Sequence, residues 1–502
     1  MKLHREILRL AVPSILANIT VPLVGMVDIA IAGHLASGFG SAALIGGISV
    51  GTMLFDLLYW NFAFLRAGTG GLTAQAYGET VAGSSSVIAG SSSVIAGSSS
   101  VIAGSDRQSP ATGHILLRAL RIALLSGLAL IAVQWLVVQG AFLVVKCTPE
   151  VRQLASQYFY IRIWAAPATL SLFAFKGWFI GMQDSVRAMT ADLVVNGVNI
   201  LGSLVLALGI PGLFASLGFR GIALGTVLAQ WTGAAYCTLA ILARYRSQFA
   251  GSVPKNGHFQ GQSGQNSASV RKNGLFQGRN TFFTLNRDLF LRSVGMIAVY
   301  IGFTAISAGF GDMMLAVSTI LMKLLMIFSY FTDGFAYAGE ALTGRFVGER
   351  SGDGIKSTVS QTFIWSIGVA ALFMLVYGIG GVPLLRLMTS DPAVVDAGRA
   401  FLPWLLLMPA IGCPAFMWDG IFIGATASKH LRNSTLFCAI GFFAFWIAAR
   451  LLDPGASSRT LLHILMGAYF IHLAVRSVYL TAAWPRLLPK ILPANNGEGE
   501  GQ

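Results

Sequence analysis

The chain has 502 residues, of which 55% are hydrophobic and only 11% are charged. A soluble protein of this length carries about 25% charged residues, so the composition excludes a soluble multidomain protein. The formal net charge is +14, but the sequence has no basic motif with aromatic residues interspersed. This argues against a nucleic-acid partner.

Twelve apolar segments follow one another along the chain, each long enough to cross a bilayer. They cover residues 7–35, 41–65, 114–145, 153–180, 188–210, 221–243, 289–310, 315–344, 358–382, 398–424, 430–450 and 460–483. We therefore expect an all-α membrane protein with twelve transmembrane helices.

The basic residues indicate how these helices are oriented. Connections between the spans fall alternately on two sides, and most of the 34 lysines and arginines lie on the side that holds both termini. By the positive-inside rule, both termini face the cytoplasm. We expect a multi-pass protein of the plasma membrane, which in a bacterium is the inner membrane. The first span contains Asn18, Pro22 and Asp28, which suits a functional helix better than a cleaved leader.

Two phrases occur twice in the chain. KGWFIGMQDS (176–185) shares the frame GxFIGxxxS with DGIFIGATAS (419–428), and LTAQAYGE (72–79) shares LTxxxxGE with LTGRFVGE (342–349). The repeats predict two pseudo-symmetric six-helix lobes that run in parallel, related by an axis along the membrane normal. Small residues at these positions favour close helix packing, which we prefer over a ligand-binding role.

The repeats also define the expected domains. The first lobe covers 1–243 and the second 287–484, with a flexible cytoplasmic linker at 244–286 and a cytoplasmic tail at 485–502. The first lobe contains an insertion at 82–105, where AGSSSVI is written three times over residues 82–102. Its serine and glycine content predicts a mobile low-complexity loop.

Several of these segments resemble one known family. FLRAGTGGLTAQAYGE (64–79), TDGFAYAGEALTGRFVGE (332–349) and DGIFIGATASKHLRNS (419–434) are similar to the multidrug and toxic compound extrusion (MATE) family, and most closely to its DinF-like branch. The resemblance implies a secondary exporter with two six-helix lobes around a V-shaped cavity, driven by inward flow of protons or sodium.

Asp28 is the strongest candidate for the coupling residue. An acid inside a transmembrane helix costs about 2.5–3.5 kcal/mol on insertion scales, so it is a functional hypothesis by default. Asp28 follows Pro22, which removes a backbone hydrogen bond and bends the helix. A carboxylate at a bend can bind a proton while the helix changes shape. In the resemblance, the coupling aspartate of the family falls on Asp28.

A polar stripe on the fifth span can serve the same carboxylate. Asp192, Asn196, Asn199 and Ser203 share one helical face, although a packing role is equally compatible with the spacing. The resemblance places Asn199 and Thr226 in the cation site. Many relatives have an acid where this chain has Ser203, which weakens a two-carboxylate sodium site and favours protons.

The second lobe holds further charges, and the substrate cavity is expected among them. Asp333 and Glu340 share a face of the eighth span, Asp419 lies on the tenth, and Lys323 is the one plainly intramembrane lysine. These acids either attract a cationic substrate or pair with Lys323, and pairing is the simpler interpretation.

We therefore expect a monomeric secondary antiporter that exports amphipathic cationic compounds in exchange for protons. No enzymatic motif, Walker loop or cofactor site is visible in the sequence. The four cysteines form no CxxC pair, so a metal site is not predicted either. Two alternatives stay open, namely an exporter of an organic anion, metabolite or lipid-linked substrate, and a non-transporting membrane receptor.

The heptad insertion generates the first testable prediction. Deleting residues 82–102 removes no charged or aromatic group and changes loop-closure entropy by about 1 kcal/mol or less. The variant is expected to match the intact chain in expression, thermal stability in detergent and initial export rate. A variant that inserts normally but loses most of its transport would contradict the low-complexity interpretation and assign a gating role to the segment.

Overall fold

The computed structural model describes residues 2–35, 40–91, 110–145, 147–210, 212, 215–246, 278–389 and 391–492. The elements of the first half are α1 (Lys2–His34), α2 (Ser41–Trp60), α3 (Phe64–Ser91), α4 (Pro110–Ala132), α5 (Gln134–Val144), α6 (Pro149–Arg162), η2 (Ile163–Ala165), α7 (Ala166–Gly181), α8 (Ser185–Leu208) and α9 (Phe219–Arg244). Those of the second half are α12 (Gly278–Ala308), α13 (Asp312–Gly348), α14 (Gly352–Met388), α15 (Pro392–Arg399), α16 (Leu402–Gly424), α17 (Ser428–Leu452) and α18 (Ser458–Ile491).

Twelve helical segments among the described residues are long and apolar enough to cross a membrane, which confirms the predicted fold class. Three predicted spans are each built from more than one helix. The second divides into α2 and α3, the third into α4 and α5, and the fourth into α6, η2 and α7. Hydropathy alone does not register such breaks, because the apolar composition continues across them.

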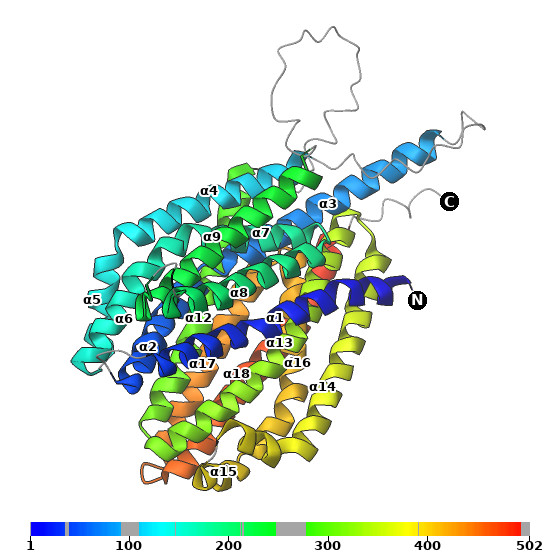
Figure 1. Ribbon diagram of the computed structural model, residues 1–502. Coiled ribbons are helices and arrows are strands. Elements are labelled where there is room, and N and C mark those ends of the chain that lie inside the picture. The colour runs from blue at the N-terminus through cyan, green and yellow to red at the C-terminus, as the bar shows by residue number, and fades with distance from the viewer. Residues whose placement is uncertain are drawn as a thin grey trace.

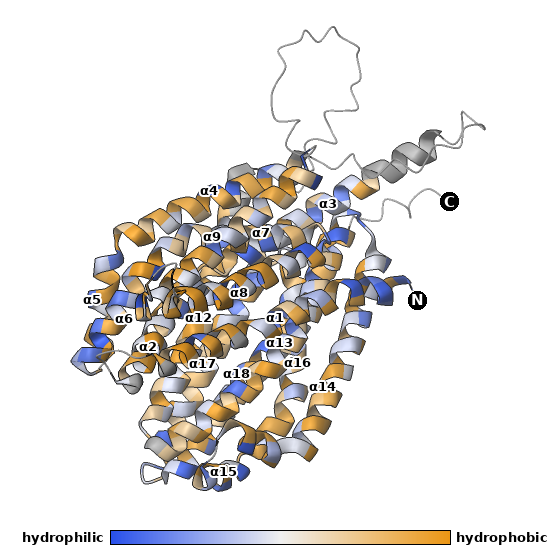
Figure 2. Cartoon of the chain, in the orientation of Figure 1, coloured by the Kyte–Doolittle hydropathy of each residue, from blue (hydrophilic) through white to orange (hydrophobic). Residues whose placement is uncertain are grey.

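Hydrophobic residues predominate along the helices of the bundle (Figure 2). On α14, one stripe of large side chains is strongly exposed, including Ile367, Leu375 and Ile379, of which Ile379 is 77% exposed. A helix that buries one face in protein and exposes another apolar face is suited to a lipid environment.

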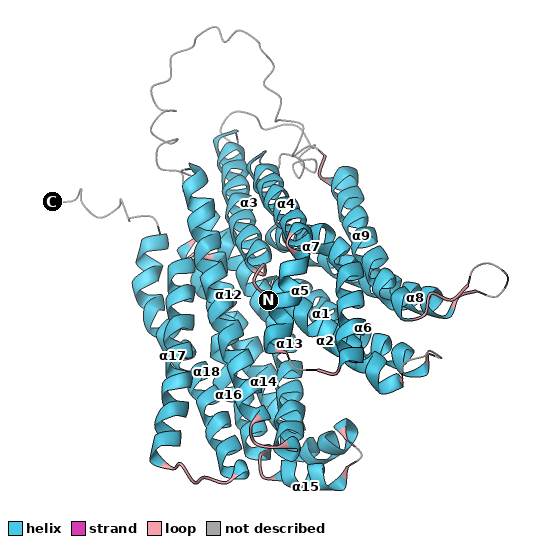
Figure 3. Cartoon of the chain, turned by 90° about the vertical axis from the view of Figure 1, so that its left-hand side faces the viewer, coloured by secondary structure: helices cyan, strands magenta, loops and turns pink. Residues whose placement is uncertain are grey.

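The two halves lie beside each other and meet along α1, α3, α12 and α13 (Figures 1 and 3). Helix α1 begins and α18 ends at the same end of the bundle, at the right of Figure 1. We call this end the terminal side. The repeated phrases lie at the ends of α13, α7 and α16, whereas in α3 the LTxxxxGE phrase lies in the middle of the helix, which continues to Ser91.

The repeated glycines bring these helices into backbone contact. A Cβ added at Gly177 on α7 would lie 2.2 Å from the carbonyl oxygen of Arg66 on α3. Its counterpart in the second half, Gly420 on α16, would place a Cβ 2.0 Å from the carbonyl oxygen of Ala336 on α13. The same contact is therefore made twice, once within each half.

A second glycine pair joins the halves to each other. A Cβ at Gly78 on α3 would lie 1.9 Å from the carbonyl oxygen of Arg345, and one at Gly348 on α13 would lie 2.1 Å from that of Gln75. The two contacts are reciprocal, as expected for a two-fold axis between α3 and α13. They pack the halves together on the terminal side, which supports the packing interpretation of the repeats.

Three helices extend across the predicted domain boundaries. Helix α3 continues to Ser91, so the first residues of the predicted loop at 82–105 are helical. Helix α12 begins at Gly278, inside the predicted linker, and α18 runs to Ile491, beyond the predicted start of the tail at 485. The rest of the insertion, linker and tail lies largely outside the described residues.

The reciprocal contacts generate a stability prediction. Gly78→Ala places a methyl group against the backbone of α13, and overpacking of this kind costs about 1–3 kcal/mol. We expect a lower thermal denaturation midpoint in detergent.

Gly368→Ala on α14 is the matched control, because a Cβ there meets nothing within 4 Å. Alanine is the better helix former, so this control is expected to keep or slightly raise the midpoint. Equal midpoints for the two variants would contradict the close packing between α3 and α13.

Candidate functional site

Asp28 lies in the middle of the first half, on α1 where this helix packs against α8. It is only 5% exposed. Pro22 lies within the same continuous helix, six residues before it. Three predicted partners are also buried, namely Asn199 and Ser203 on α8 and Thr226 on α9.

A chain of hydrogen bonds fixes the orientation of the Asn199 amide. The Thr226 hydroxyl donates to the carbonyl oxygen of Ile222 at 3.4 Å, so its oxygen is free to accept. Asn199 Nδ2 donates to that oxygen at 2.9 Å. The amide nitrogen of Asn199 therefore faces Thr226, and its carbonyl oxygen points elsewhere.

Two buried oxygens at this site have no hydrogen-bond partner within the described part of the chain, Asp28 Oδ1 and Asn199 Oδ1. Both can only accept a hydrogen bond while Asp28 is ionised. A buried acceptor without a donor is costly, and a proton on the carboxylate supplies a donor. Protonation of Asp28 would therefore give its carboxyl group a donor that the ionised form lacks.

Ser203 adds a hydroxyl that can turn between two acceptors. It donates to the carbonyl oxygen of Ile222 at 3.3 Å, and it also lies within reach of a hydrogen bond to Asp28. One hydroxyl proton cannot serve both oxygens. Ser203 can donate to an ionised Asp28, whereas a protonated Asp28 can donate to Ser203 and leave the bond to Ile222 intact.

The other two residues of the predicted stripe face different partners. Asn196 Nδ2 donates to Thr20 Oγ1 on α1 at 2.6 Å, so it ties α8 to α1. Asp192 forms an ion pair with Lys176 on α7. The structure thus brings Ser203 to Asp28 and joins Asn199 to Thr226, but it pairs Asp192 with a lysine.

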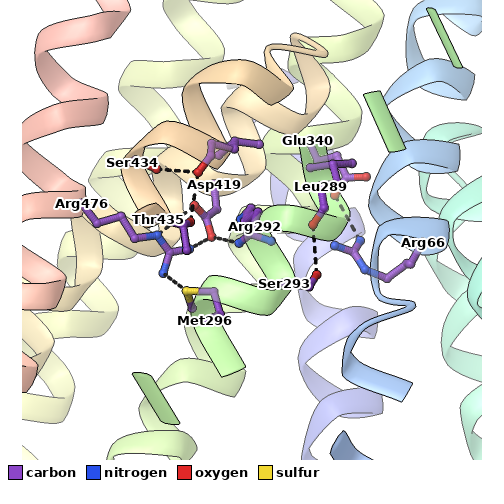
Figure 4. Close-up of polar contacts among 11 residues, drawn as sticks. Arg66, Leu289, Arg292, Ser293, Met296, Glu340, Asp419, Ser434, Thr435 and Arg476 are labelled. Carbon is purple, nitrogen blue, oxygen red and sulfur yellow. Dashed lines mark hydrogen bonds and ion pairs between the residues drawn. The ribbon is translucent and has the colours of Figure 1, made fainter. Parts of the chain in front are cut away.

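A central charged cluster is formed by five residues of the second half, Arg292, Asp333, Glu340, Asp419 and Arg476, together with Arg66 of the first half. Figure 4 shows two arginines pointing at Asp419, Arg292 from α12 and Arg476 from α18. Arg476 Nε donates to Asp419 Oδ1 at 3.1 Å. The Arg476 side chain is only 1% exposed, so Asp419 offsets the cost of burying it.

A second pair in this cluster crosses between the halves. Arg66 Nη1 on α3 lies 3.1 Å from Glu340 Oε2 on α13, and the Glu340 side chain is fully buried (Figure 4). Glu340 occupies the repeat position of Gly70, 270 residues earlier. A Cβ at Gly70 would lie 2.1 Å from Glu340 Oε1, so the glycine leaves room for the carboxylate.

The predicted pairing of the acids with Lys323 is wrong for Glu340 and Asp419. Their partners are arginines on other helices. Lys323 and Glu340 lie on the same helix, 17 residues and roughly 25 Å apart at 1.5 Å per residue, which rules out a direct contact. Lys323 is instead exposed and interacts electrostatically with Asp56 on α2.

Sequence reasoning does not find the arginine partners of these acids. Arg66 falls one residue beyond the predicted second span, and Arg292 lies close to the start of the seventh. Arg476 lies within the twelfth span, but nothing in its local sequence relates it to Asp419. An unpaired intramembrane acid is itself a signal that a buried cation lies on a neighbouring helix.

Comparisons with known proteins identify the family of the chain. A family model, MatE, matches residues 85–205 and 289–446. DNA damage-inducible protein F of Escherichia coli (strain K12) is 30% identical over 480 residues, which cover 95% of this chain and 91% of that protein.

Solved structures show the same fold. A crystal structure of MATE in the bent conformation has a TM-score of 0.72 at 16% identity, covering 97% of this chain and 98% of that one. An outward-facing multidrug resistance MATE family transporter also has a TM-score of 0.72, at 15% identity, covering 98% and 97%. This chain therefore belongs to the MATE family of membrane transporters.

Proposed function

We propose that this chain is a secondary active antiporter that exports amphipathic, cationic organic compounds in exchange for protons. The observation that carries the proposal is the Asp28 site, with its two unpartnered acceptor oxygens. A multidrug resistance transporter among the structural relatives supports an organic substrate. The protein is proposed to act as a monomer in a bacterial inner membrane.

The orientation of the molecule follows from its basic residues. The positive-inside rule assigns the terminal side to the cytoplasm. The reciprocal glycine contacts of Gly78 and Gly348 close the halves together on that side. The described conformation is therefore assigned to the state that opens away from the cytoplasm, in which a proton enters and the substrate leaves.

Coupling is assigned to the protonation of Asp28. In the outward-open state a proton binds the Asp28 carboxylate. The protonated group can then donate a hydrogen bond to the side-chain oxygen of Asn199 or Ser203. The neutral group no longer attracts a cation, so the substrate is released. Opening of the terminal side then returns the proton to the cytoplasm and prepares the site for the next substrate.

The substrate is placed between the halves, where polar and aromatic groups keep accessible surface. Helix α13 presents Tyr330, Asp333 and Tyr337 on one face, and all three are partly exposed. Carboxylates beside aromatic rings suit organic cations.

One observation favours the alternative that the substrate is an organic anion. The Arg66 and Arg292 side chains of the central charged cluster are 20% and 17% exposed, so a carboxylate or phosphate on a substrate could compete with Glu340 and Asp419 for them. Counterflow into vesicles separates the two classes. A cation such as tetraphenylphosphonium is expected to be transported, and transport of organic anions alone would favour the alternative. A receptor would transport neither.

The coupling role of Asp28 is tested by Asp28→Asn, which keeps the size and removes the titratable group. The variant is expected to insert normally and to lose at least tenfold in export rate under an imposed pH gradient in vesicles. Asp396→Asn on α15, whose side chain is 69% exposed, is the control and is expected to export like the intact chain. Wild-type export by Asp28→Asn would make Asp28 a structural residue.

The identity of the ion is tested separately. The site has one carboxylate, with Ser203 where many relatives have an acid, and sodium prefers several oxygen ligands. Export is expected to continue in sodium-free buffer and to stop when a protonophore collapses the pH gradient. Strict dependence on sodium, with no effect of the protonophore, is the outcome that would overturn proton coupling.

A further inference from the structure

Arg162 lies inside the first half, and its guanidinium group has no role in the mechanism proposed above. It ends α6 in the middle of the fourth span. Its Nη1 donates to Tyr158 Oη at 3.2 Å and to Thr52 Oγ1 at 3.5 Å, and its guanidinium lies 4.7 Å from the centre of the Phe55 ring. These contacts are all to neutral groups.

The positive charge of Arg162 has two acids as electrostatic partners and a direct ion pair with neither. Asp28 on α1 and Asp56 on α2 both interact with it, as do the hydroxyls of Tyr59 and Tyr158. None of the ion pairs formed among the described residues includes Arg162. Thr52, which accepts a hydrogen bond from Arg162, lies one helical turn from Asp56 on α2.

Asp56 differs from Asp28 because it is exposed. It faces the second half, where it interacts electrostatically with Lys323 and Tyr330 on α13 and with Tyr300 on α12. The ring of Trp60, one turn further along α2, lies 5.0 Å from that of Tyr300. An accessible carboxylate beside aromatic rings is suited to the cationic group of an organic substrate.

We propose that Arg162 is shared between Asp28 and Asp56, and that this sharing couples the proton to the substrate cation. The inference rests on the proposed function, because it takes Asp28 as the proton site. A cation bound at Asp56 displaces the charge of Arg162 toward Asp28. The Asp28 O–H bond then breaks, the proton leaves to water, and the carboxylate pairs with the guanidinium.

The reverse direction follows from the same sharing. A proton that binds Asp28 neutralises it, so Arg162 is left with Asp56 as its counter-ion and competes with the substrate there. Each ligand therefore weakens the binding of the other by the same factor, as thermodynamic linkage requires. An antiporter requires this negative coupling between proton binding and substrate binding.

The test measures equilibrium binding of tetraphenylphosphonium to the purified full-length protein at pH 6 and pH 8. This cation has no titratable group of its own. The intact chain is expected to bind it at least fivefold more tightly at pH 8, which is the lower end of typical coupling factors. Arg162→Gln is expected to bind it with less than a twofold difference between the two pH values.

Two further variants calibrate the result. Lys323→Gln removes a cation that acts on Asp56 but not on Asp28, so it is expected to raise affinity equally at both pH values and to keep the wild-type ratio. Arg162→Lys keeps the charge and is expected to keep a ratio above fivefold. Arg162→Lys also provides a test of the proposal if Arg162→Gln does not fold.

A wild-type ratio in Arg162→Gln overturns the proposal, as does loss of the ratio in a folded Arg162→Lys. Asp28→Asn separates this failure from failure of the proposed function. If Asp28→Asn loses the ratio while Arg162→Gln keeps it, Asp28 is the proton site and Arg162 is not the coupling residue. If Asp28→Asn also keeps the ratio, both the proton site and the coupling through Arg162 are wrong.

Discussion

The cost of placing a charge inside a membrane governs the arrangement of this molecule. An intramembrane charge must find a counter-charge, a set of hydrogen bonds or a proton. In the second half the acids take the first solution, since Glu340 pairs with Arg66 and Asp419 with Arg292 and Arg476. Asp28 takes none of them completely, because one of its oxygens has no partner among the described residues. That difference separates the two halves chemically.

The glycine contacts between helices, in contrast, are symmetric. Glycines at equivalent positions of α7 and α16 contact equivalent carbonyl groups of α3 and α13. Side chains at equivalent positions differ, as with Gly70 and Glu340, or Lys176 and Asp419. A symmetric frame is suited to movement of the halves against each other, and the difference in charges is what the proposed coupling through Asp28 depends on.

The sequence was sufficient to predict the twelve spans and the repeat, and it placed Ser203, which lies within reach of Asp28, on the stripe proposed to serve that carboxylate. These follow from hydropathy, from periodicity within a helix and from the family resemblance. Ion pairs between helices were not predictable, because they depend on how helices from different parts of the chain pack together. Glu340 and Arg66 are 274 residues apart, and no local pattern relates them. Helix ends were misplaced where alanine and serine continue a helix beyond its apolar part, as in α3.

The central claim is that substrate and proton exclude each other through Asp28. Its most direct test is the number of protons released when tetraphenylphosphonium binds the purified protein in weakly buffered solution with a pH indicator. The account predicts release of up to one proton per bound cation from the intact chain and none from Asp28→Asn at equal occupancy. Equal proton release from both proteins would contradict it.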